Sequence, residues 1–166
     1  MIEAILNRRS IRKYTKGAVD EQQVRQLLLA GMAAPSALGN EPWVFVVIRD
    51  RDTLARIPKA HPYAKMVPKA ALAILVCHDE RITKGADWYV QDCSAATENI
   101  LIAASALGLG AVWLGVYPRQ DRVDKLRELL GLEPFLMPFS LIPVGHPGES
   151  KSAKTTFKDD KTRFIG

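Results

Sequence analysis

The sequence contains little of what several classes of protein require. Only 7% of its 166 residues are aromatic, and it has two cysteines and three histidines. No apolar run reaches the length that spans a membrane. Cys77 and Cys93 show neither metal-ligand spacing nor a disulfide framework, and the histidines are widely separated. These absences argue against a membrane protein, a metal site and a disulfide-stabilised secreted domain, and they predict a chain of the reducing cytoplasm.

Two sequence signals of targeting and nucleotide binding are also missing. The first residues include Glu3 and have helical periodicity, so they lack the layout of a signal peptide. No G-x-G-x-x-G turn is present, so a Rossmann site for a nicotinamide nucleotide is not expected. Hydrophobic residues make up 48% of the chain, which at this length predicts one domain with a sizeable core.

Positive charge, in contrast, is plentiful at the two ends of the chain. Residues 1–16 hold five Lys/Arg and one Glu, and residues 148–166 hold five Lys/Arg and three Asp/Glu. The stretch Arg8-Arg9-Ser10-Ile11-Arg12-Lys13 places four cations around one hydroxyl. Because guanidinium groups suit phosphate oxygens, it predicts a compact phosphate site. A diffuse basic surface is the alternative, and a nucleic-acid partner is not expected because interleaved aromatics are lacking.

Hydrophobic periodicity and turn residues predict alternating helices and strands. The predicted helices are residues 2–6, a helix that runs from an N-cap at Asp20 to Pro35, residues 52–57 ending at Pro58, residues 87–107, and residues 120–130. The predicted strands are residues 43–48, 70–77, 110–116 and 139–144. The polar remainder from His146 onward is too short for a domain and is predicted to be a tail or a docking arm.

Two segments have compositions that allow close packing. The alanine-rich helix 87–107 suits a core position, a dimer face, or both. Small residues in the loop 34–43 would let its backbone approach a flat ligand, although an ordinary helix-to-strand loop has similar residues. The isolated histidines and tyrosines are interpreted as structural; they include His61, His78, Tyr63, Tyr89 and Tyr117.

In their joint order these motifs resemble those of the nitroreductase family, FMN-dependent oxidoreductases that act as homodimers. The resemblance spans nearly the whole chain. It is carried by Arg8-Arg9-Ser10-Ile11-Arg12-Lys13-Tyr14, Ala34-Pro35-Ser36, Glu41-Pro42-Trp43, Asp92-Cys93-Ser94-Ala95-Ala96, Ala106-Leu107-Gly108-Leu109-Gly110, Val112-Trp113-Leu114-Gly115, Val144-Gly145-His146-Pro147-Gly148-Glu149 and Lys161-Thr162-Arg163.

The resemblance implies an α+β fold. This fold is a three-layer α/β/α sandwich with a mixed, mostly antiparallel sheet, whereas alternation of helices and strands alone would suggest a parallel doubly wound sheet. The FMN-binding domain would span residues 1–147. Residues 148–166 would form a C-terminal arm of the same domain that crosses to the dimer partner.

The resemblance also assigns residues to FMN. They are Arg8, Arg9, Ser10, Arg12, Pro35, Ser36, Ala37, Leu38, Asn40, Leu114, Gly115, Lys161 and Arg163. The first four would hold the phosphate and ribityl end, Arg9 mainly through its backbone, and the last two would reach the same phosphate from the arm. Residues 35–38 of the partner would line the isoalloxazine ring. Backbone N–H groups of the strand end 114–115 would face flavin N5 and O4, where negative charge develops on reduction.

The loop departs from the family pattern at two positions. The family usually has Asn where this chain has Gly39, and Gln where it has Glu41. Asn40 is the candidate replacement for the missing Asn.

The activity implied is a ping-pong reaction. NADH or NADPH would pass hydride to flavin N5 and leave, and a nitroaromatic, a quinone or a similar acceptor would take its place. No side chain has to act as acid or base, so neither a catalytic residue nor a metal ligand is assigned. The alternatives are a flavin-dependent dehalogenase or flavin-destructase-like relative, and a non-catalytic flavin-binding protein.

Overall fold

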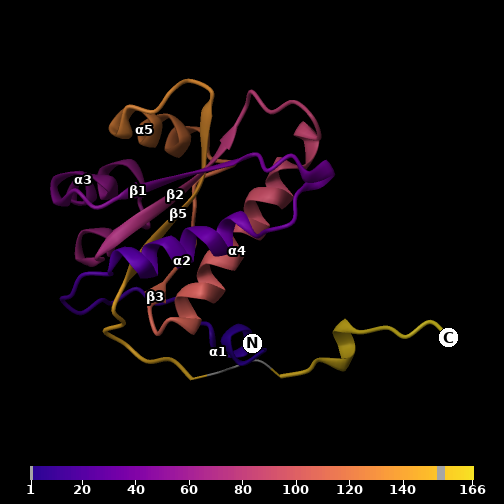
Figure 1. Ribbon diagram of the computed structural model, residues 1–166. Coiled ribbons are helices and arrows are strands. Elements are labelled where there is room, and N and C mark those ends of the chain that lie inside the picture. Colours follow the sequence, from indigo (N-terminus) through magenta and orange to yellow (C-terminus); the bar gives the residue numbers. More distant parts are fainter. Residues whose placement is uncertain (1, 153–155) are drawn as a thin grey trace.

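A five-stranded sheet forms the middle layer of the computed structural model, which describes residues 2–152 and 156–166 (Figure 1). Its strands are β1 (Trp43–Ile48), β2 (Leu72–Asp79), β3 (Gly110–Ala111), β4 (Leu114–Gly115) and β5 (Leu136–Gly145). Their order is β1-β2-β5-β3, and β4 also pairs with β5. Every pair between these strands is antiparallel, and a single parallel bridge joins Ser10 to Ala111. The predicted α+β class is confirmed.

Helices cover both faces of this sheet. They are α2 (Glu21–Met32), α3 (Arg51–Ala60), α4 (Tyr89–Ala106) and α5 (Gln120–Leu130), whereas the short helix α1 (Ile2–Asn7) has no buried residue and lies against α4. Short 3₁₀ turns occur at Ala37–Gly39, Val67–Lys69, Ala86–Trp88 and Asp159–Lys161. Helices α2 and α4 lie on one side of the sheet, and α3 and α5 lie on the other (Figure 1).

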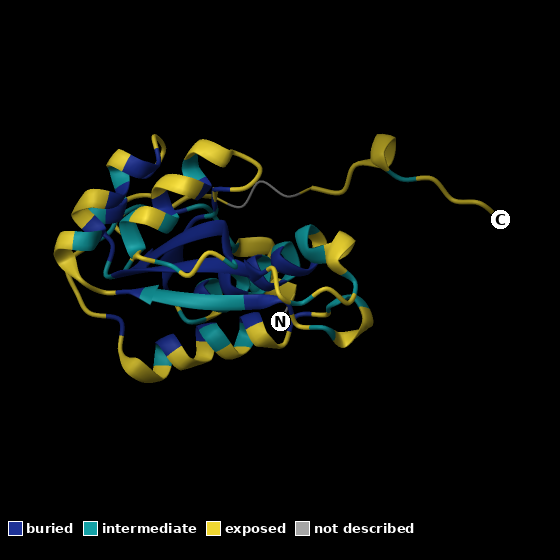
Figure 2. Ribbon diagram, turned by 90° about the horizontal axis from the view of Figure 1, so that it is seen from above, coloured by how far each residue is buried: buried dark blue, intermediate teal, exposed yellow. Residues whose placement is uncertain are grey.

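Strand β2 shows why the layers assemble in this way. Ile74 and its alternate neighbours pack in a core with α2 and α4, whereas Leu75 and its alternate neighbours pack in a core with α3 and α5. Successive strand residues point to opposite faces, so a strand that is apolar over residues 72–77 needs cover on both sides. All of β2 is buried, and the helices present their exposed sides outward (Figure 2). The three-layer prediction is therefore confirmed.

Several predicted boundaries are wrong: β2, β5 and α4 span Leu72–Asp79, Leu136–Gly145 and Tyr89–Ala106 instead of residues 70–77, 139–144 and 87–107. Two further differences have a clear physical reason. Helix α3 contains Pro58 instead of ending there, and His61 N–H still bonds the Ile57 carbonyl at 3.0 Å. A proline in the last turn removes only one hydrogen bond, and the buried Ile57 and Ala60 hold this turn on the core. The predicted strand 110–116 is interrupted and forms β3 and β4. Both β3 and β4 pair with β5 in one continuous register. The residues between them face Pro143 of β5, which has no N–H to donate.

The two parts of the C-terminal arm lie differently. Residues 148–152 lie along the N-terminal segment, where Gly148 N–H donates to the Lys13 carbonyl at 2.8 Å. Residues 156–166 extend away from the layers (Figures 1 and 2). The division into a domain of residues 1–147 and an arm of residues 148–166 stays a prediction, and residues 1 and 153–155 lie outside the described part.

Candidate functional site

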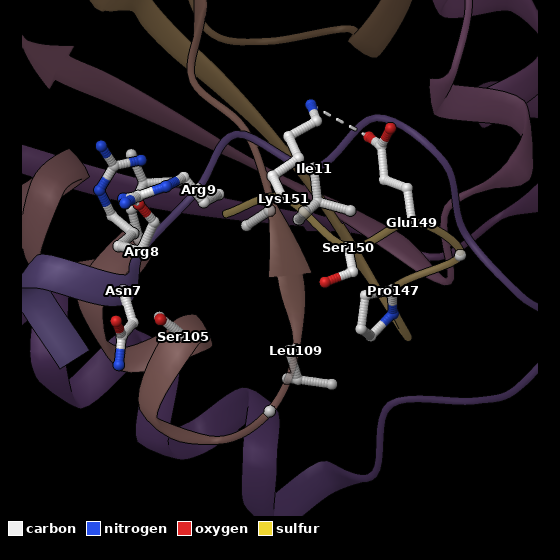
Figure 3. A pocket seen from close by; sticks show the side chains of 14 residues that line it. Asn7, Arg8, Arg9, Ile11, Ser105, Leu109, Pro147, Glu149, Ser150 and Lys151 are labelled. Atoms are coloured by element: carbon white, nitrogen blue, oxygen red, sulfur yellow. Dashed lines mark hydrogen bonds and ion pairs between the residues drawn. The ribbon is translucent and has the colours of Figure 1, made fainter. Parts of the chain in front are cut away.

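The arginine motif opens onto two neighbouring cavities. One, of about 570 Å³, is lined by Arg8 and Arg9, by the end of α4 and by residues 147–151 (Figure 3). The second, called the arginine pocket here, is lined by Arg9, Ser10, Arg12, Ser150, Lys151 and Ser152. Parts of the two chain ends therefore meet at one cationic site.

Two of the arginines are not free cations, contrary to what their density in the sequence suggests. Arg8 Nε lies 3.0 Å from Glu98 Oε1 on α4, so Arg8 is paired within the chain. Arg9 donates from Nε to the Ser152 carbonyl at 2.9 Å and from Nη1 to the Leu6 carbonyl at 2.9 Å. Its Nη2 is buried and has no partner among the described residues. Arg9 therefore offers a side-chain donor, whereas the resemblance had assigned it mainly a backbone role.

Glu149 and Lys151 tie the C-terminal segment to the arginine motif. A carboxylate oxygen of Glu149 accepts the backbone N–H groups of Arg12 at 2.6 Å and Lys13 at 3.3 Å. Lys151 Nζ donates to the Ser10 carbonyl at 2.5 Å and lies 3.3 Å from Glu149, the contact drawn in Figure 3. These backbone hydrogen bonds hold the pKa of Glu149 below its ordinary value.

A third cavity, called the Gly115 pocket here, adjoins the arginine motif. It measures about 530 Å³ and is lined by Arg12, His61, Pro62, Tyr63, Lys65, Met66, Trp113, Leu114 and Gly115. Nothing lies within 4 Å of the position that a Cβ on Gly115 would take. The backbone of this strand end is therefore open to a flat ligand.

His61 fixes the position of Gly115. Its ring Nε2 lies 2.9 Å from the Gly115 carbonyl, and its Nδ1 accepts the Tyr63 N–H at 3.3 Å. This pair of bonds requires the neutral ring with its proton on Nε2. Burial holds the pKa of His61 below its ordinary value, which favours the same neutral form.

Arg12 belongs to both the arginine pocket and the Gly115 pocket. The two cavities therefore lie side by side, one polar and cationic, the other with aromatic and apolar walls. This arrangement suits an elongated ligand with an anionic end and a flat end.

This geometry agrees with the comparisons with known proteins. The family model described as "Nitroreductase family" matches residues 5–70 and 59–146. The chain belongs to the nitroreductase family.

Three family relatives illustrate the similarity. A Methanothermobacter thermautotrophicus protein named as an NADH dehydrogenase/NAD(P)H nitroreductase is 47% identical over 161 residues, 97% of this chain and 84% of that protein. A crystal structure of that name from Parabacteroides distasonis is 39% identical with a TM-score of 0.93, and the match covers 99% of this chain and 97% of that one. A Desulfovibrio desulfuricans nitroreductase in complex with FMN is 35% identical with a TM-score of 0.84, covering 99% and 96%.

The loop that the nitroreductase motifs assign to the flavin ring lies away from the arginines. Ala37 N–H donates to Asp92 Oδ1 at 3.0 Å near the start of α4, whereas Ser105, near its end, lines the cavity at the arginines. Arg8 meets α4 between these two points, at Glu98, but none of residues 35–38 lines the cavities described above. In the described part of one chain, residues 35–38 and the arginines therefore do not share a cavity.

Several loop side chains are already engaged. Asn40 Nδ2 donates to the Lys84 carbonyl at 2.6 Å, and only its buried Oδ1 lacks a partner in the described part of the chain. Ser36 Oγ accepts the Glu41 N–H at 3.0 Å. Leu38 has a φ of 57° and is 67% exposed, so its side chain points outward from this protomer. One N–H of the Asn40 amide is therefore engaged within the chain, which leaves its second N–H and its Oδ1 for the predicted flavin contact.

Lys161 and Arg163 lie on the extended segment 156–166, which leaves the layers (Figure 1). Neither lines the cavities at the arginine motif that are described above. Their contact with a phosphate stays a prediction.

Sequence reasoning missed several residues of these pockets. They are His61, Tyr63, Lys65, Met66, Trp113 and Lys151. His61 and Tyr63 were interpreted as structural because each stands alone in the sequence. A lysine or tyrosine in a turn carries no periodic signal, and only the fold brings residues 61–66 beside the strand end 114–115.

The described residues contain neither a reactive cysteine nor a cluster of metal ligands. Burial raises the pKa of the Cys77 and Cys93 thiols to about 12, so both stay protonated and unreactive at neutral pH. Residues 2–152 and 156–166 hold no group of three His, Cys, Asp or Glu side chains placed to bind a metal ion. None of their helices combines the length and apolar character that crossing a membrane needs.

Proposed function

We propose that this protein is an FMN-dependent oxidoreductase that oxidises NADH or NADPH and reduces nitroaromatic, quinone or similar acceptors. The main support is the position of Arg12, which joins the cationic arginine pocket to the flat-walled Gly115 pocket. FMN has a phosphate at one end and a flat tricyclic ring at the other, so it matches this pair of cavities. The FMN complex of the Desulfovibrio relative and the NAD(P)H nitroreductase names of the other two relatives support the same choice.

The donors at the site fit FMN. The buried, unpartnered Nη2 of Arg9 can donate to a phosphate oxygen, and Arg12 adds a second guanidinium nearby. Lys65 lines the same pocket as the strand end 114–115 and can bring a further positive charge to bound FMN. Bound FMN supplies the hydride chemistry, while the chain binds it, orients it and presents fixed backbone N–H groups to its reducible edge.

A homodimer is part of this proposal. Residues 35–38 line none of the cavities at the arginine motif, so a loop from a second chain would line the ring. The expected cytoplasmic location is also part of it, because the two cysteines are free and buried, as suits a reducing compartment.

The decisive experiment is a visible absorption spectrum of the purified protein, followed by anaerobic titration with NADH and NADPH. We expect a flavin spectrum that either nucleotide bleaches and that an added nitroaromatic or quinone restores. A colourless protein whose melting temperature does not respond to added FMN would contradict the proposal. Flavin binding without NAD(P)H oxidation would indicate a non-catalytic flavin protein, and reductive turnover of halotyrosines would indicate a dehalogenase.

Replacing Arg12 tests the residue on which the proposal depends. Arg12→Ala should weaken FMN binding roughly 10- to 100-fold, because a charge-assisted hydrogen bond contributes about 1.5–3 kcal/mol. Titration of the apoprotein followed by flavin fluorescence measures this change. The matched control is Arg25→Ala, which removes an arginine whose side chain is 80% exposed on α2. Equal FMN affinity in Arg12→Ala and the parent would count against the assignment.

A further inference from the structure

Arg122 contacts the lining of the Gly115 pocket, although it comes from the outer helix layer and is not itself one of the lining residues. It lies in the first turn of α5, and its Nη1 donates to the Gly115 carbonyl at 2.8 Å. Its Cζ is 5.3 Å from the centroid of the Tyr63 ring. Arg122 therefore touches two residues that line the pocket, and these contacts hold its guanidinium group in place.

The charge of Arg122 is not neutralised within the described residues. It makes no ion pair there, and the adjacent Asp121 is instead 3.3 Å from Arg119. The Nε of Arg122 is buried without a hydrogen-bond partner in the same part of the chain. The lining of the Gly115 pocket includes no carboxylate that could neutralise this charge. This edge of the site therefore favours a ligand that brings a negative charge.

An aromatic surface lies next to this charge. Tyr63 is 67% exposed, so its ring is available for stacking by a planar ligand. The fork of guanidinium N–H groups matches a carboxylate, and the positive end of α5 adds to the attraction.

We propose that Arg122 and Tyr63 recognise the electron acceptor, and that the preferred acceptors are planar aromatic compounds bearing a carboxylate, the nitrobenzoate class. This inference rests on the proposed function, since it requires the reducible edge of FMN at Gly115. In the reaction, NAD(P)H supplies two electrons and one proton, and water supplies a second proton. The nitro group becomes a nitroso group and one oxygen leaves as water.

Two acceptors that differ in charge provide the test. The kcat/KM ratio of 4-nitrobenzoate to 4-nitrobenzyl alcohol is measured for the parent, Arg122→Gln and Arg119→Gln. We expect a ratio above one in the parent and a fall of about tenfold or more in Arg122→Gln, through KM for nitrobenzoate, as expected for a lost charge-assisted hydrogen bond. His61 still donates to the Gly115 carbonyl in this variant, so the strand end keeps one anchor.

Arg119→Gln is the matched control. Arg119 is the residue before the first turn of α5, so its replacement removes the same charge from the same end of the same helix. It contacts Asp121 rather than the pocket. The kcat/KM ratio of Arg119→Gln for the two acceptors should therefore equal that of the parent. Arg122→Lys, which keeps the charge but loses the fork, should give an intermediate ratio and decides the question if the glutamine variant does not fold.

An equilibrium binding measurement, in which no acceptor is reduced, provides a second test of Arg122. The dissociation constants of benzoate and benzyl alcohol are measured from the change in flavin absorption of the FMN-loaded protein. Benzoate should bind more tightly than benzyl alcohol, and Arg122→Gln should weaken benzoate binding about tenfold. Added salt should weaken benzoate binding in the parent and have less effect in the variant.

The possible failures are distinguishable. Absence of FMN binding or of NAD(P)H oxidation contradicts the proposed function itself. Normal turnover with the same acceptor ratio in Arg122→Gln and the parent overturns only this inference. A change in the NADPH-to-NADH preference of Arg122→Gln, with the acceptor ratio unchanged, would assign Arg122 to the electron donor and also overturn it.

Discussion

Asp92 shows how one buried side chain can hold a functional loop. It is 5% exposed, it lies in the first turn of α4, and its Oδ1 accepts the Ala37 N–H at 3.0 Å. Its Oδ2 is buried and has no hydrogen-bond partner among the described residues. The loop after Ala37 contains two non-glycine residues at positive φ, Leu38 and Glu41. This conformation persists only when surrounding contacts hold it.

Replacement of Asp92 should therefore destabilise the protein. Asp92→Ala leaves the Ala37 N–H without its acceptor and should lower the free energy of unfolding by about 1–3 kcal/mol. Asp92→Asn keeps an oxygen in the same place and should cost less. Urea unfolding of the three proteins measures the difference. Equal stability of Asp92→Ala and the parent would show that this hydrogen bond does not hold the loop.

Among the larger elements, the segment 148–152 joins the end of the chain to its beginning. It is anchored by Glu149, whose carboxylate accepts the N–H groups of Arg12 and Lys13. Because the pKa of Glu149 is lowered in the folded state, this carboxylate stabilises the fold above its unfolded-state pKa of about 4.3. The contribution is lost as the pH falls through the lower folded-state pKa.

A pH series tests this segment. The free energy of unfolding is measured for the parent and Glu149→Gln from roughly pH 3 to pH 7, which brackets the ordinary range of glutamate. The parent should be the more stable protein at pH 7, and the difference should shrink as the pH falls below about 4. Glu128→Gln, which replaces an exposed glutamate on α5, serves as the control and should show no such trend. A difference that is constant with pH would contradict the role of the charge.

For the molecule as a whole, the proposed homodimer would account for the extended segment 156–166. Phe157, Phe164 and Ile165 are 72%, 91% and 99% exposed in the single chain. Apolar side chains exposed to this degree on one segment are expected to be covered by a partner. The arm would then carry Lys161 and Arg163 toward the partner's arginine pocket.

Sedimentation of the full chain tests this assembly. We expect a dimer for the parent, and a dimer dissociation constant at least about tenfold higher for the double variant Phe157→Ala/Phe164→Ala, because each buried phenylalanine contributes about 1.5–3 kcal/mol. Lys158→Ala changes a charged neighbour on the same segment and should leave the constant unchanged. A parent protein that sediments as a monomer at micromolar concentration would remove the basis for a shared site.

Several elements could be predicted from the sequence because their signals are local. Asp20 and Gln23 form the capping box that begins α2, with Gln23 N–H donating to Asp20 at 2.7 Å. Strand β1 has the predicted bounds, since six apolar, mostly β-branched or aromatic residues favour an extended chain. Gly131 ends α5 at a φ of 60°, a conformation that glycine adopts without strain.

The candidate site was predictable only in part. The residue types of the arginine motif already indicated an anion, because guanidinium chemistry does not depend on the fold. The pairing of Arg8 with Glu98 was not predictable, and neither was the meeting of residues 61–66 with the strand end 114–115. Such contacts join residues that are tens of positions apart and leave no periodic pattern in the chain.

The sequence by itself determined the order of most elements and the cationic end of the site, since short-range propensity and side-chain chemistry are enough for these. The order of its motifs also carried the family resemblance. The tertiary structure alone decided that Arg12 lies between two cavities and that His61 and Arg122 share the Gly115 carbonyl. Strand pairing and layer packing set those distances, and neither is encoded in any one stretch of residues.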